Sequence, residues 1–431
     1  MKLLVIGGGG REHALVWKLA QDPRVSAIWC APGNGGIGME RLLGNGKNVT
    51  CESIPAECIN DLSWLAIRNK VDLTIVGPDN PLALAIVDRF QQTGEPIFGP
   101  KRSAARFEFS KCYTQKFAEK HGIAIAPGEC FTDSARAKAY AAGLKGKCVV
   151  KADGLAFGKG AFPCDSIKEA WEAIDILMVN GEHGIAGKSI VIQDLLLGKE
   201  ASFHAICDGK TVKLFPTSKD HKRLLDGNKG PMTGGMGAYS PYPFVDDTIL
   251  EKFNRNILLP WQKGCVAEGI DYRGILYPGV MITPEGEPIL LEFNARFGDP
   301  ETQVYLTRLH SNLLDLLFAS VLGTLHKVEL AFEPFFSVCV VMASPGYPGP
   351  YDKDKGISGI EEAEKVPNLK VFHAGTVCEN GKCLTNGGRV LGVTGFGKDL
   401  KTAIATAYEG VERINFEGGV HYRKDIGLKV D

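Results

Sequence analysis

The first hundred residues alternate short apolar runs with amphipathic segments. The apolar runs predict strands at Lys2–Gly7, Val25–Ala31, Val71–Gly77 and Pro96–Gly99. The segments between them predict helices at Glu12–Gln21, Ala56–Asn69 and Pro81–Gln92. Strands that alternate with helices form a parallel sheet covered on both faces, so we expect a doubly wound N-terminal domain. Ligands of such sheets bind at the carboxyl ends of the strands, where this chain has glycine-rich turns.

The middle of the chain has longer elements in a less regular order. Helices are expected at Ser103–Gly122, Ile167–Asn180, Asp247–Glu268 and Leu306–Gly323, and strands at Lys147–Lys151, Ser189–Gln193, Gly274–Thr283 and from Ile289 onward. Residues 218–240 are rich in glycine and charge and show little periodicity, which is typical of disorder or of a functional lid. The charges at Asp220–Arg223 are clustered too tightly for an ordinary solvated surface, and this favours the lid.

A last region begins near Pro334. It contains a strong strand pattern at Ser337–Ala343, a hairpin of Val371–Thr376 and Arg389–Thr394, and an amphipathic helix at Leu400–Ile414. The chain of 431 residues is too long for one core. We therefore predict three domains, at residues 1–102, 103–332 (with a lid subdomain at about 123–195) and 333–431.

Composition narrows the function classes. The chain is 44% hydrophobic with a formal net charge of −1, which argues against a nucleic-acid binder. Neither a signal-peptide pattern nor an apolar run of about 18 residues is present, so we expect a cytoplasmic protein without membrane contact. The 12 cysteines are scattered and lack a C-x-x-C pair. We therefore expect reduced thiols rather than zinc or a disulfide framework.

The strand that begins at Ile289 carries the most specific chemistry. Side chains alternate faces along a strand, so Glu292, Asn294 and Arg296 share one face. Their oxygens suit Mg²⁺ held together with nucleotide phosphates, and the guanidinium suits the phosphate or carboxylate beside it. The alternative is a salt bridge on an edge strand.

A lysine-bearing strand leads into a glycine-rich turn at Lys151–Gly160, with a further lysine on the turn. Backbone N–H groups and lysines in this order cover phosphates. The turn is not a Walker A loop, because Asp153 and Gly160 stand where glycine and Ser or Thr are needed. A flexible hairpin with solvated lysines is the alternative. After Ser189–Gln193, residues 194–203 read as a hinge between two sheets that could meet a base, with Glu200 on ribose hydroxyls, or as a plain strand–turn–strand.

The N-terminal loop Gly7–Arg11 could be mistaken for a dinucleotide fingerprint. Glu12 stands where the third glycine is needed, and the second strand ends in Pro32-Gly33-Asn34 without an acidic residue. A glycine loop that enters a helix can instead cradle a monophosphate, and we favour this over a purely structural turn. His13 is as readily a capping or core histidine as a ligand contact.

In this order the motifs resemble the glycinamide ribonucleotide synthetase (phosphoribosylamine–glycine ligase) family of the ATP-grasp superfamily. The matching segments span nearly the whole chain: G-x-G-G-R-E-H-A at Gly7–Ala14, A-P-G-N at Ala31–Asn34, T-I-V-G-P at Thr74–Pro78, K-A-D-G-L-A-x-G-K-G at Lys151–Gly160, D-H-K-R at Asp220–Arg223, T-G-G-M-G-A-Y-S-P at Thr233–Pro241, E-F-N-x-R-F-G-D-P-E-T-Q at Glu292–Gln303, H-A-G-T at His373–Thr376, T-N-G-G-R-V-L at Thr385–Leu391 and R-K-D-I-G at Arg423–Gly427.

The resemblance implies a two-sheet ATP-grasp core, a small β-rich C-terminal domain, and a ligase that joins glycine to 5-phosphoribosylamine through glycyl phosphate, with ATP and Mg²⁺ or Mn²⁺. It implies the following roles: metal binding by Glu292 and Asn294; ATP binding by Lys111, Lys151, Gly154, Gly158, Lys159, Gly160, Gln193, Asp194, Leu196 and Glu200; catalysis by Arg296, Asp220 and Lys222; and ribose-phosphate substrate binding by Gly9, Gly10, Arg11, Asp79 and Asp299. It also implies a transient contact with the enzyme that supplies phosphoribosylamine.

Several positions depart from the family pattern. Gln193-Asp194 stand where two glutamates are usual, and Met232, Lys219 and Asp79 also differ. The strand Gly274–Thr283 offers no second metal carboxylate. Three alternatives remain: another ATP-grasp carboxylate–amine ligase, an NAD(P)-dependent oxidoreductase that uses the N-terminal sheet, or a nucleotide sensor without turnover.

Overall fold

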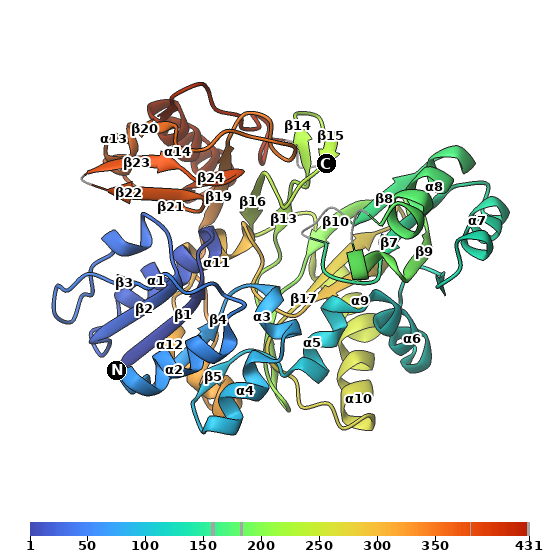
Figure 1. The fold of residues 1–431 in the computed structure, drawn as a ribbon, viewed down its shortest axis with the longest axis horizontal. Helices are drawn as coiled ribbons and strands as arrows, with labels where there is room; N and C mark the ends of the chain where they lie inside the picture. Colours follow the sequence, from blue (N-terminus) through green and yellow to red (C-terminus); the bar gives the residue numbers. More distant parts are fainter. Residues whose placement is uncertain (157–159, 182–183, 380, 429–431) are drawn as a thin grey trace.

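The computed structural model describes residues 1–156, 160–181, 184–379 and 381–428 (Figure 1). The N-terminal sheet is parallel throughout, in the order β3-β2-β1-β4-β5. Its elements are β1 (Lys2–Gly7), α1 (Gly10–Ala20), β2 (Ala27–Pro32), β3 (Thr50–Cys51), α2 (Ile59–Asn69), β4 (Leu73–Val76), α3 (Asp79–Ala83), α4 (Ile86–Thr93) and β5 (Ile97–Phe98). The doubly wound prediction is confirmed; the short β3 was not predicted.

Alternation along β1 explains the two covered faces. Leu4 and Ile6 are buried in one core with α2 and α4, whereas Leu3 and Val5 are buried in another with α1 and α12 (Leu313–Leu322). A strand buried on both faces reads as a continuous apolar run, as this one does. The carboxyl ends of β1, β2 and β4 then meet at one edge of the sheet.

In the structure, two of the predicted helices in the first part of the chain are each divided into two shorter helices. Pro81–Gln92 divides into α3 and α4 at Ala85, which has a left-handed backbone with φ of 66°. Ser103–Gly122 divides into α5 (Arg102–Phe109) and α6 (Lys111–His121). Ser110 between them is extended, and its side chain accepts a hydrogen bond from the backbone N–H of Tyr113, which makes it the N-cap of α6. Lys111 therefore lies at the first position of a helix.

A separate lobe follows α6 and projects from the body (Figure 1). Its antiparallel sheet has the order β6-β9-β7-β8. Its elements are β6 (Gly128–Phe131), α7 (Ser134–Gly143), β7 (Cys148–Ala152), β8 (Ala161–Cys164), α8 (Ile167–Ile174), the π-turn Asp175–Val179 and β9 (Ile190–Asp194). The lobe has its own core, which includes Phe131, Val150 and Ile192. We call the whole unit the lobe and its sheet the lobe sheet.

The central region has a second sheet, in which β17 pairs with three other strands. It comprises β10 (Lys199–Ser202), β11 (Ala205–Asp208), β12 (Val212–Leu214), β17 (Arg273–Ile282) and β18 (Pro288–Asn294). It is flanked by α9 (Asp247–Phe253), a π-turn at Asn254–Leu258, α10 (Leu259–Ala267), α11 (Glu301–Arg308) and α12. The predicted helix Leu306–Gly323 is thus two helices. The chain passes from the lobe sheet to this sheet between Asp194 and Lys199, as the hinge prediction required.

A bulge in β18 sets the faces of its side chains. Gly279 pairs with Glu292 but Val280 pairs with Leu290, so Leu291 is an extra residue. Phe293 beyond the bulge is buried, whereas Glu292 is partly exposed on the other face. The predicted alternation is confirmed.

Residues 218–240 are not an irregular lid, and that prediction is wrong. They form β13 (Lys219–Asp220), β14 (Arg223–Leu225), β15 (Lys229–Met232) and β16 (Gly237–Ser240). All four residues of β16 are buried, because the strand lies between β13 and β19 in the sheet β13-β16-β19-β24-β21. The central region and the C-terminal region therefore share a sheet.

The remaining C-terminal elements complete that region. They are β19 (Phe336–Ala343), β20 (Gly356–Ser358), α13 (Ile360–Glu364), β21 (Leu369–His373), β22 (Thr376–Glu379), β23 (Lys382–Thr385), β24 (Arg389–Gly397), α14 (Leu400–Arg413) and β25 (Asn415–Phe416). A second sheet has the order β22-β23-β20-β25. Within the described ranges, helices of the length and hydropathy needed for a membrane span are absent.

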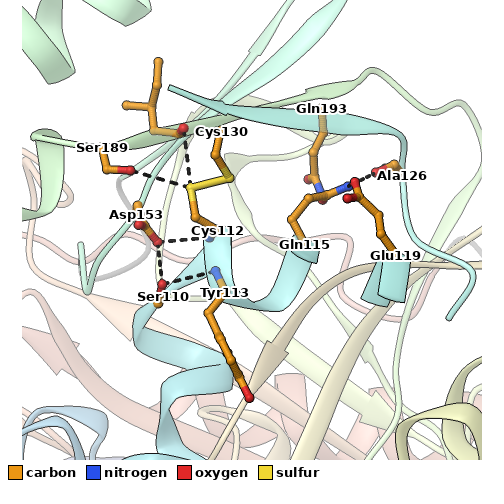
Figure 2. The surroundings of a disulfide bond; sticks show 11 residues. Ser110, Cys112, Tyr113, Gln115, Glu119, Ala126, Cys130, Asp153, Ser189 and Gln193 are labelled. Atoms are coloured by element: carbon orange, nitrogen blue, oxygen red, sulfur yellow. Dashed lines mark hydrogen bonds between the residues drawn. A yellow bond between two sulfur atoms is a disulfide. The ribbon is translucent and has the colours of Figure 1, made fainter. Parts of the chain in front are cut away.

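The prediction of reduced thiols is wrong for four cysteines. Cys112 of α6 is bonded to Cys130 of β6, and Cys378 is bonded to Cys383 across the β22–β23 hairpin (Figure 2 shows the first pair). In both pairs the fold brings together cysteines whose spacing matches no familiar motif.

The side chain of Phe372 packs the C-terminal region against the N-terminal domain, and its substitution tests this packing. This fully buried residue meets His13 and Trp17 of α1 edge-on, with ring centroids 5.7 and 5.5 Å away. Phe372→Ala should lower the unfolding free energy by about 3–5 kcal/mol, because it leaves a cavity. Thermal unfolding measures this. Trp64→Ala, at a side chain that is 65% exposed, is the control and should change little; equal midpoints for the two variants would contradict the packing.

Candidate nucleotide and substrate site

A cleft between the lobe sheet and the β17 sheet gathers lysines around Glu292. Lys111 Nζ lies 3.0 Å from Glu292 Oε2, and Lys151 Nζ donates to the Leu291 carbonyl at 2.9 Å. The three residues come from α6, β7 and β18. A small cavity of about 10 Å³ lies among them, lined also by Phe107, Thr114, Ile125, Val191, Gln193 and Phe293.

The charges of this cleft shift its pKa values. Lys111, followed by Lys222 and Lys151, holds the pKa of Glu292 well below its usual range, so the carboxylate stays ionised. Burial lowers the pKa of Lys151 to about 8. The charges of Lys111 and Lys222 also lower the pKa of Lys151, whereas the charge of Glu292 raises it. The cleft therefore carries crowded positive charge that an anionic ligand would relieve.

The Asp220–Arg223 cluster divides among different partners. Lys222 Nζ lies 3.2 Å from Glu200 Oε2, and the pair raises the pKa of Lys222 and lowers that of Glu200. His221 Nδ1 contacts the Gly237 carbonyl, and Arg223 donates to the Gly230 carbonyl. Lys222 therefore extends the lysine cluster of the cleft, whereas His221 and Arg223 stabilise the local strands.

Asp220 faces a crowded interior. Burial, and then the charge of Glu301, raise the pKa of its carboxyl well above the usual range. Its Oδ1 atom is buried and has no hydrogen-bond donor among the described residues. A buried acceptor without a donor is costly. This atom is therefore placed to receive a cationic or N–H group from a ligand.

Arg296 continues the face that Glu292 begins. Its Nη2 atom lies 3.2 Å from Asn294 Oδ1 and 3.1 Å from Glu108 Oε1. Glu108 also accepts the N–H of Ala295 at 2.8 Å, which fixes the turn after β18. Glu292, Asn294 and Arg296 therefore lie on one side of the chain, as predicted.

Gln193 is held by a chain of side-chain amides at the inner end of the cavity (Figure 2). Gln115 Nε2 donates to Glu119 Oε1 and to the Ala126 carbonyl, at 2.8 and 3.2 Å. Both partners are acceptors, so Gln115 must present its oxygen to Gln193 Nε2, 2.7 Å away. Gln193 Oε1 is then a buried acceptor without a donor among the described residues.

The glycine-rich turn after β7 is tied to the start of α6. Asp153 Oδ1 accepts hydrogen bonds from the Ser110 hydroxyl and from the N–H of Cys112, both at 3.0 Å. A side chain at Gly154 would meet Ala186 at 2.5 Å. Gly160 is buried at the start of β8. Gly158 and Lys159 lie outside the described residues.

Other predicted ATP contacts lie on the connection to the second sheet. Asp194 ends β9, and its N–H donates to the Pro127 carbonyl at 2.9 Å. Leu196 is half-buried between the sheets, and Glu200 lies on β10.

The N-terminal loop is closed by Glu12. Its carboxylate accepts the N–H of Gly9 at 2.7 Å and pairs with Arg11 Nε at 2.6 Å. Arg11 also donates to the Phe297 carbonyl at 3.0 Å, so this guanidinium joins the loop to the turn after β18. Asp79 is the first residue of α3, and its charge raises the pKa of Arg296. His13 is buried between Glu40 and the His373 N–H, at 3.0 and 2.7 Å, as a core histidine.

Asp299 lies where the N-terminal, central and C-terminal regions meet. Arg389 Nη2 lies 3.1 Å from its Oδ2 atom, and Gln303 donates to Oδ1 at 2.7 Å. A side chain at Gly10 would lie 2.6 Å from Gln303 Nε2, and one at Gly9 would lie 3.4 Å from Asp299 Oδ2. Sequence reasoning did not assign Arg389, although it lies within the T-N-G-G-R-V-L segment.

Two groups of residues bring potential metal ligands close together. Glu292 and Asn294 supply an ionised carboxylate and an amide oxygen, which fits Mg²⁺ bound jointly with phosphates. Among the described residues, His373, Cys378 and Cys383 also place ligand atoms within 4.8 Å of one another. Their two sulfurs are bonded to each other and offer no thiolate.

Comparison with known proteins agrees with this geometry. Profiles of the phosphoribosylglycinamide synthetase N, ATP-grasp (A) and C domains match residues 1–108, 109–302 and 337–429. Phosphoribosylamine–glycine ligase of Synechocystis sp. is 45% identical over 431 residues, covering 100% of both chains, and that of Neisseria meningitidis serogroup B is 46% identical over 430 residues, covering 100% of this chain and 99% of the relative.

Solved structures show the same relationship. The phosphoribosylamine–glycine ligase of Thermotoga maritima aligns with a TM-score of 0.83 at 33% identity, over 99% of this chain and 100% of that one. A biotin carboxylase domain from Hydrogenobacter thermophilus, in complex with MgADP, shares the fold at 13% identity, with a TM-score of 0.73 over 98% and 91% of the chains. The chain belongs to the phosphoribosylglycinamide synthetase family.

Proposed function

We propose that the chain is an ATP-dependent ligase that joins glycine to 5-phosphoribosylamine through glycyl phosphate, giving glycinamide ribonucleotide, ADP and phosphate in purine biosynthesis. The observation that carries this is the cleft in which Lys111, Lys151 and Lys222 surround Glu292. Family membership supports the same reaction. A cytoplasmic location and a transient contact with the enzyme that supplies phosphoribosylamine are part of this proposal.

Phosphoryl transfer needs positioning and charge neutralisation more than a protein nucleophile. We assign the triphosphate to Lys111, Lys151 and the Gly154–Gly160 turn, the base to Gln193, Asp194 and Leu196, and the ribose to Glu200. Lys222 lies near enough to Glu292 to lower its pKa and would stabilise charge on the transferred group. Mg²⁺, held by Glu292 and Asn294, would neutralise phosphate charge when it is bound with ATP.

We assign the glycine to Asp220 and Arg296. The ammonium group would give the buried Asp220 Oδ1 the donor it lacks. Arg296 offers a guanidinium to the carboxylate, which attacks the γ-phosphorus, and then to the acyl phosphate. The amine of phosphoribosylamine displaces phosphate in the second step.

We assign the ribose phosphate to the loop with Gly9, Gly10 and Arg11, together with Asp79 and Asp299. The hydrogen bond from Arg11 to the Phe297 carbonyl holds this loop against the turn after β18, and Gln303 leaves no room for a side chain at Gly10. An amine held at the loop would therefore face the acyl phosphate. The alternative dinucleotide site is disfavoured, because Glu12 fills the space that the third glycine would leave.

Substrate dependence of ADP release tests the proposal. ATP, Mg²⁺, glycine and fresh phosphoribosylamine should give ADP only when both co-substrates are present. Nucleotide binding without ADP release would indicate a sensor. Activity with a different carboxylate or amine would indicate another ATP-grasp ligase, and a nicotinamide fluorescence titration checks for NAD(P) binding.

Glu292→Gln should reduce kcat at least about 100-fold, because it removes the only carboxylate of the proposed metal pair. The amide can still contact Lys111, but the three lysines lose their compensating charge, so the thermal midpoint should fall while the circular dichroism spectrum stays that of the wild type. Steady-state ADP release at varied Mg²⁺ measures the effect. Glu285→Gln, in the exposed turn before β18, is the matched control; a near-normal kcat for Glu292→Gln would refute the metal assignment.

Affinity for ADP should fall about tenfold from pH 7 to pH 9. Phosphate binds the charged ammonium, and Lys151, with a pKa of about 8, loses its proton over this range in the free protein. Isothermal titration at each pH measures the trend. Lys151→Arg should flatten it, since guanidinium stays charged, whereas Lys188→Arg at an exposed site should not. A flat wild-type profile would show that Lys151 does not bind phosphate.

Gln193→Leu should lower kcat/KM for ATP by about tenfold through KM, because the adenine amino group loses its acceptor. The preference for ATP over GTP should fall too, since guanine presents an oxygen where adenine presents that amino group. Gln92→Leu makes the same chemical change on the exposed face of α4 and is the control. An unchanged ATP/GTP ratio would mean that only backbone groups read the base.

A further inference from the structure

The Cys112–Cys130 disulfide joins α6 to the lobe sheet (Figure 2). Cys112 directly follows Lys111 in the first turn of α6, and Cys130 lies on β6, the edge strand of the lobe sheet. Cys112 is 8% exposed, whereas Cys130 is half-buried and open to small reagents. Around Cys112, Asp153 binds the backbone N–H, and Ser189 Oγ lies 3.6 Å from the sulfur.

This bond crosses the hinge between the lobe and the body. Ala124 and Ala126 are fixed to the body, because Ala124 exchanges hydrogen bonds with Asn256 and Leu290, and the Ala126 N–H donates to Leu290. The lobe begins two residues later, at Gly128, and ends at Asp194. Pro127 and the connection 195–198 are thus the two backbone crossings, and the disulfide is a covalent third crossing.

The cleft beneath the lobe is too small for a nucleotide as it stands. Its cavity has a volume of about 10 Å³, far below the roughly 300–1,000 Å³ of ligand pockets. Lys111 and Lys151 are also engaged with Glu292 and with the Leu291 carbonyl. Entry of ATP therefore requires the lobe to move away from β18. A covalent bond between the lobe edge and α6 opposes that motion.

We propose that Cys112 and Cys130 form a thiol–disulfide site whose oxidation restrains the lobe and slows nucleotide entry, and whose reduction releases it. This inference rests on the proposed nucleotide site. The oxidant is a low-molecular-weight disulfide of the glutathione class. The half-buried Cys130 thiolate attacks it and releases one small thiol; Cys112 then attacks the Cys130 sulfur of the mixed disulfide and releases the second. Two cysteine thiols thereby lose two electrons and two protons, and one small disulfide becomes two thiols.

The chain supplies its own control. Cys378 and Cys383 form a second disulfide within the β22–β23 hairpin, away from the lobe hinge. The same reagents act on this pair, which bridges two strands already joined by a short turn. A redox effect that belongs to the hinge must persist when the second pair is replaced by serine.

The test measures association of MgADP with the full chain by stopped-flow fluorescence, after treatment with oxidised glutathione or with excess dithiothreitol. Peptide mass spectrometry of the unreduced chain follows the Cys112–Cys130 bond. The oxidised form should associate about tenfold more slowly, because binding awaits a restrained conformational change. Cys112→Ser, Cys130→Ser and the double variant should associate at the reduced rate under both treatments, and the Cys378→Ser/Cys383→Ser variant should respond as the wild type does.

Each other outcome is decisive. Equal association rates with the Cys112–Cys130 peptide present would overturn the proposal, as would failure of that peptide to form under the oxidant. A redox response that disappears in the Cys378→Ser/Cys383→Ser variant would transfer the effect to the other pair and also overturn it. Absence of MgADP binding in both redox states would refute the nucleotide site itself, which separates failure of the proposed function from failure of the redox site.

Discussion

The site depends on a balance of buried charge around Glu292. Lys111, Lys151 and Lys222 come from α6, the lobe sheet and the β13–β14 connection, and all three act on this one carboxylate. Charges are removed from water only where opposite charges compensate them. Glu292 therefore makes it possible for these elements to meet. Burial still lowers the pKa of Lys151, which shows that compensation is incomplete and that the cleft favours an additional negative charge.

Features set by neighbouring residues were predictable from the sequence. The alternation of Glu292 and Asn294 follows from strand geometry, because the bulge at Leu291 precedes both, and Arg296 lies two residues beyond β18, where it contacts Asn294. The parallel N-terminal sheet follows from alternating apolar runs and glycine turns. The passage from one sheet to the other after Asp194 also follows from local signals. In each case the determining interactions lie within a few residues along the chain.

Features set by distant partners were not predictable. The lid was expected because residues 218–240 lack periodicity, but β16 is a strand through its pairing with β19, about a hundred residues later. The Cys112–Cys130 disulfide and the contact of Arg389 with Asp299 likewise depend on the folded arrangement. The break at Ser110 is the exception, since an N-cap serine is a local signal. It was missed because the apolar periodicity continues across it.

The C-terminal region contacts the proposed site through Arg389. Arg389 binds the Gly234 and Asp299 carbonyls and the Asp299 carboxylate, so it joins the segment before β16 to the turn after β18. The same turn contacts the N-terminal loop, because Arg11 donates a hydrogen bond to the Phe297 carbonyl. Because an amine must reach an acyl phosphate within bonding distance, the relative position of the N-terminal loop and β18 determines whether the second step can occur. Arg389 thus holds the turn that carries Asp299 against the segment before β16, and this brings the C-terminal region to the edge of the proposed substrate site.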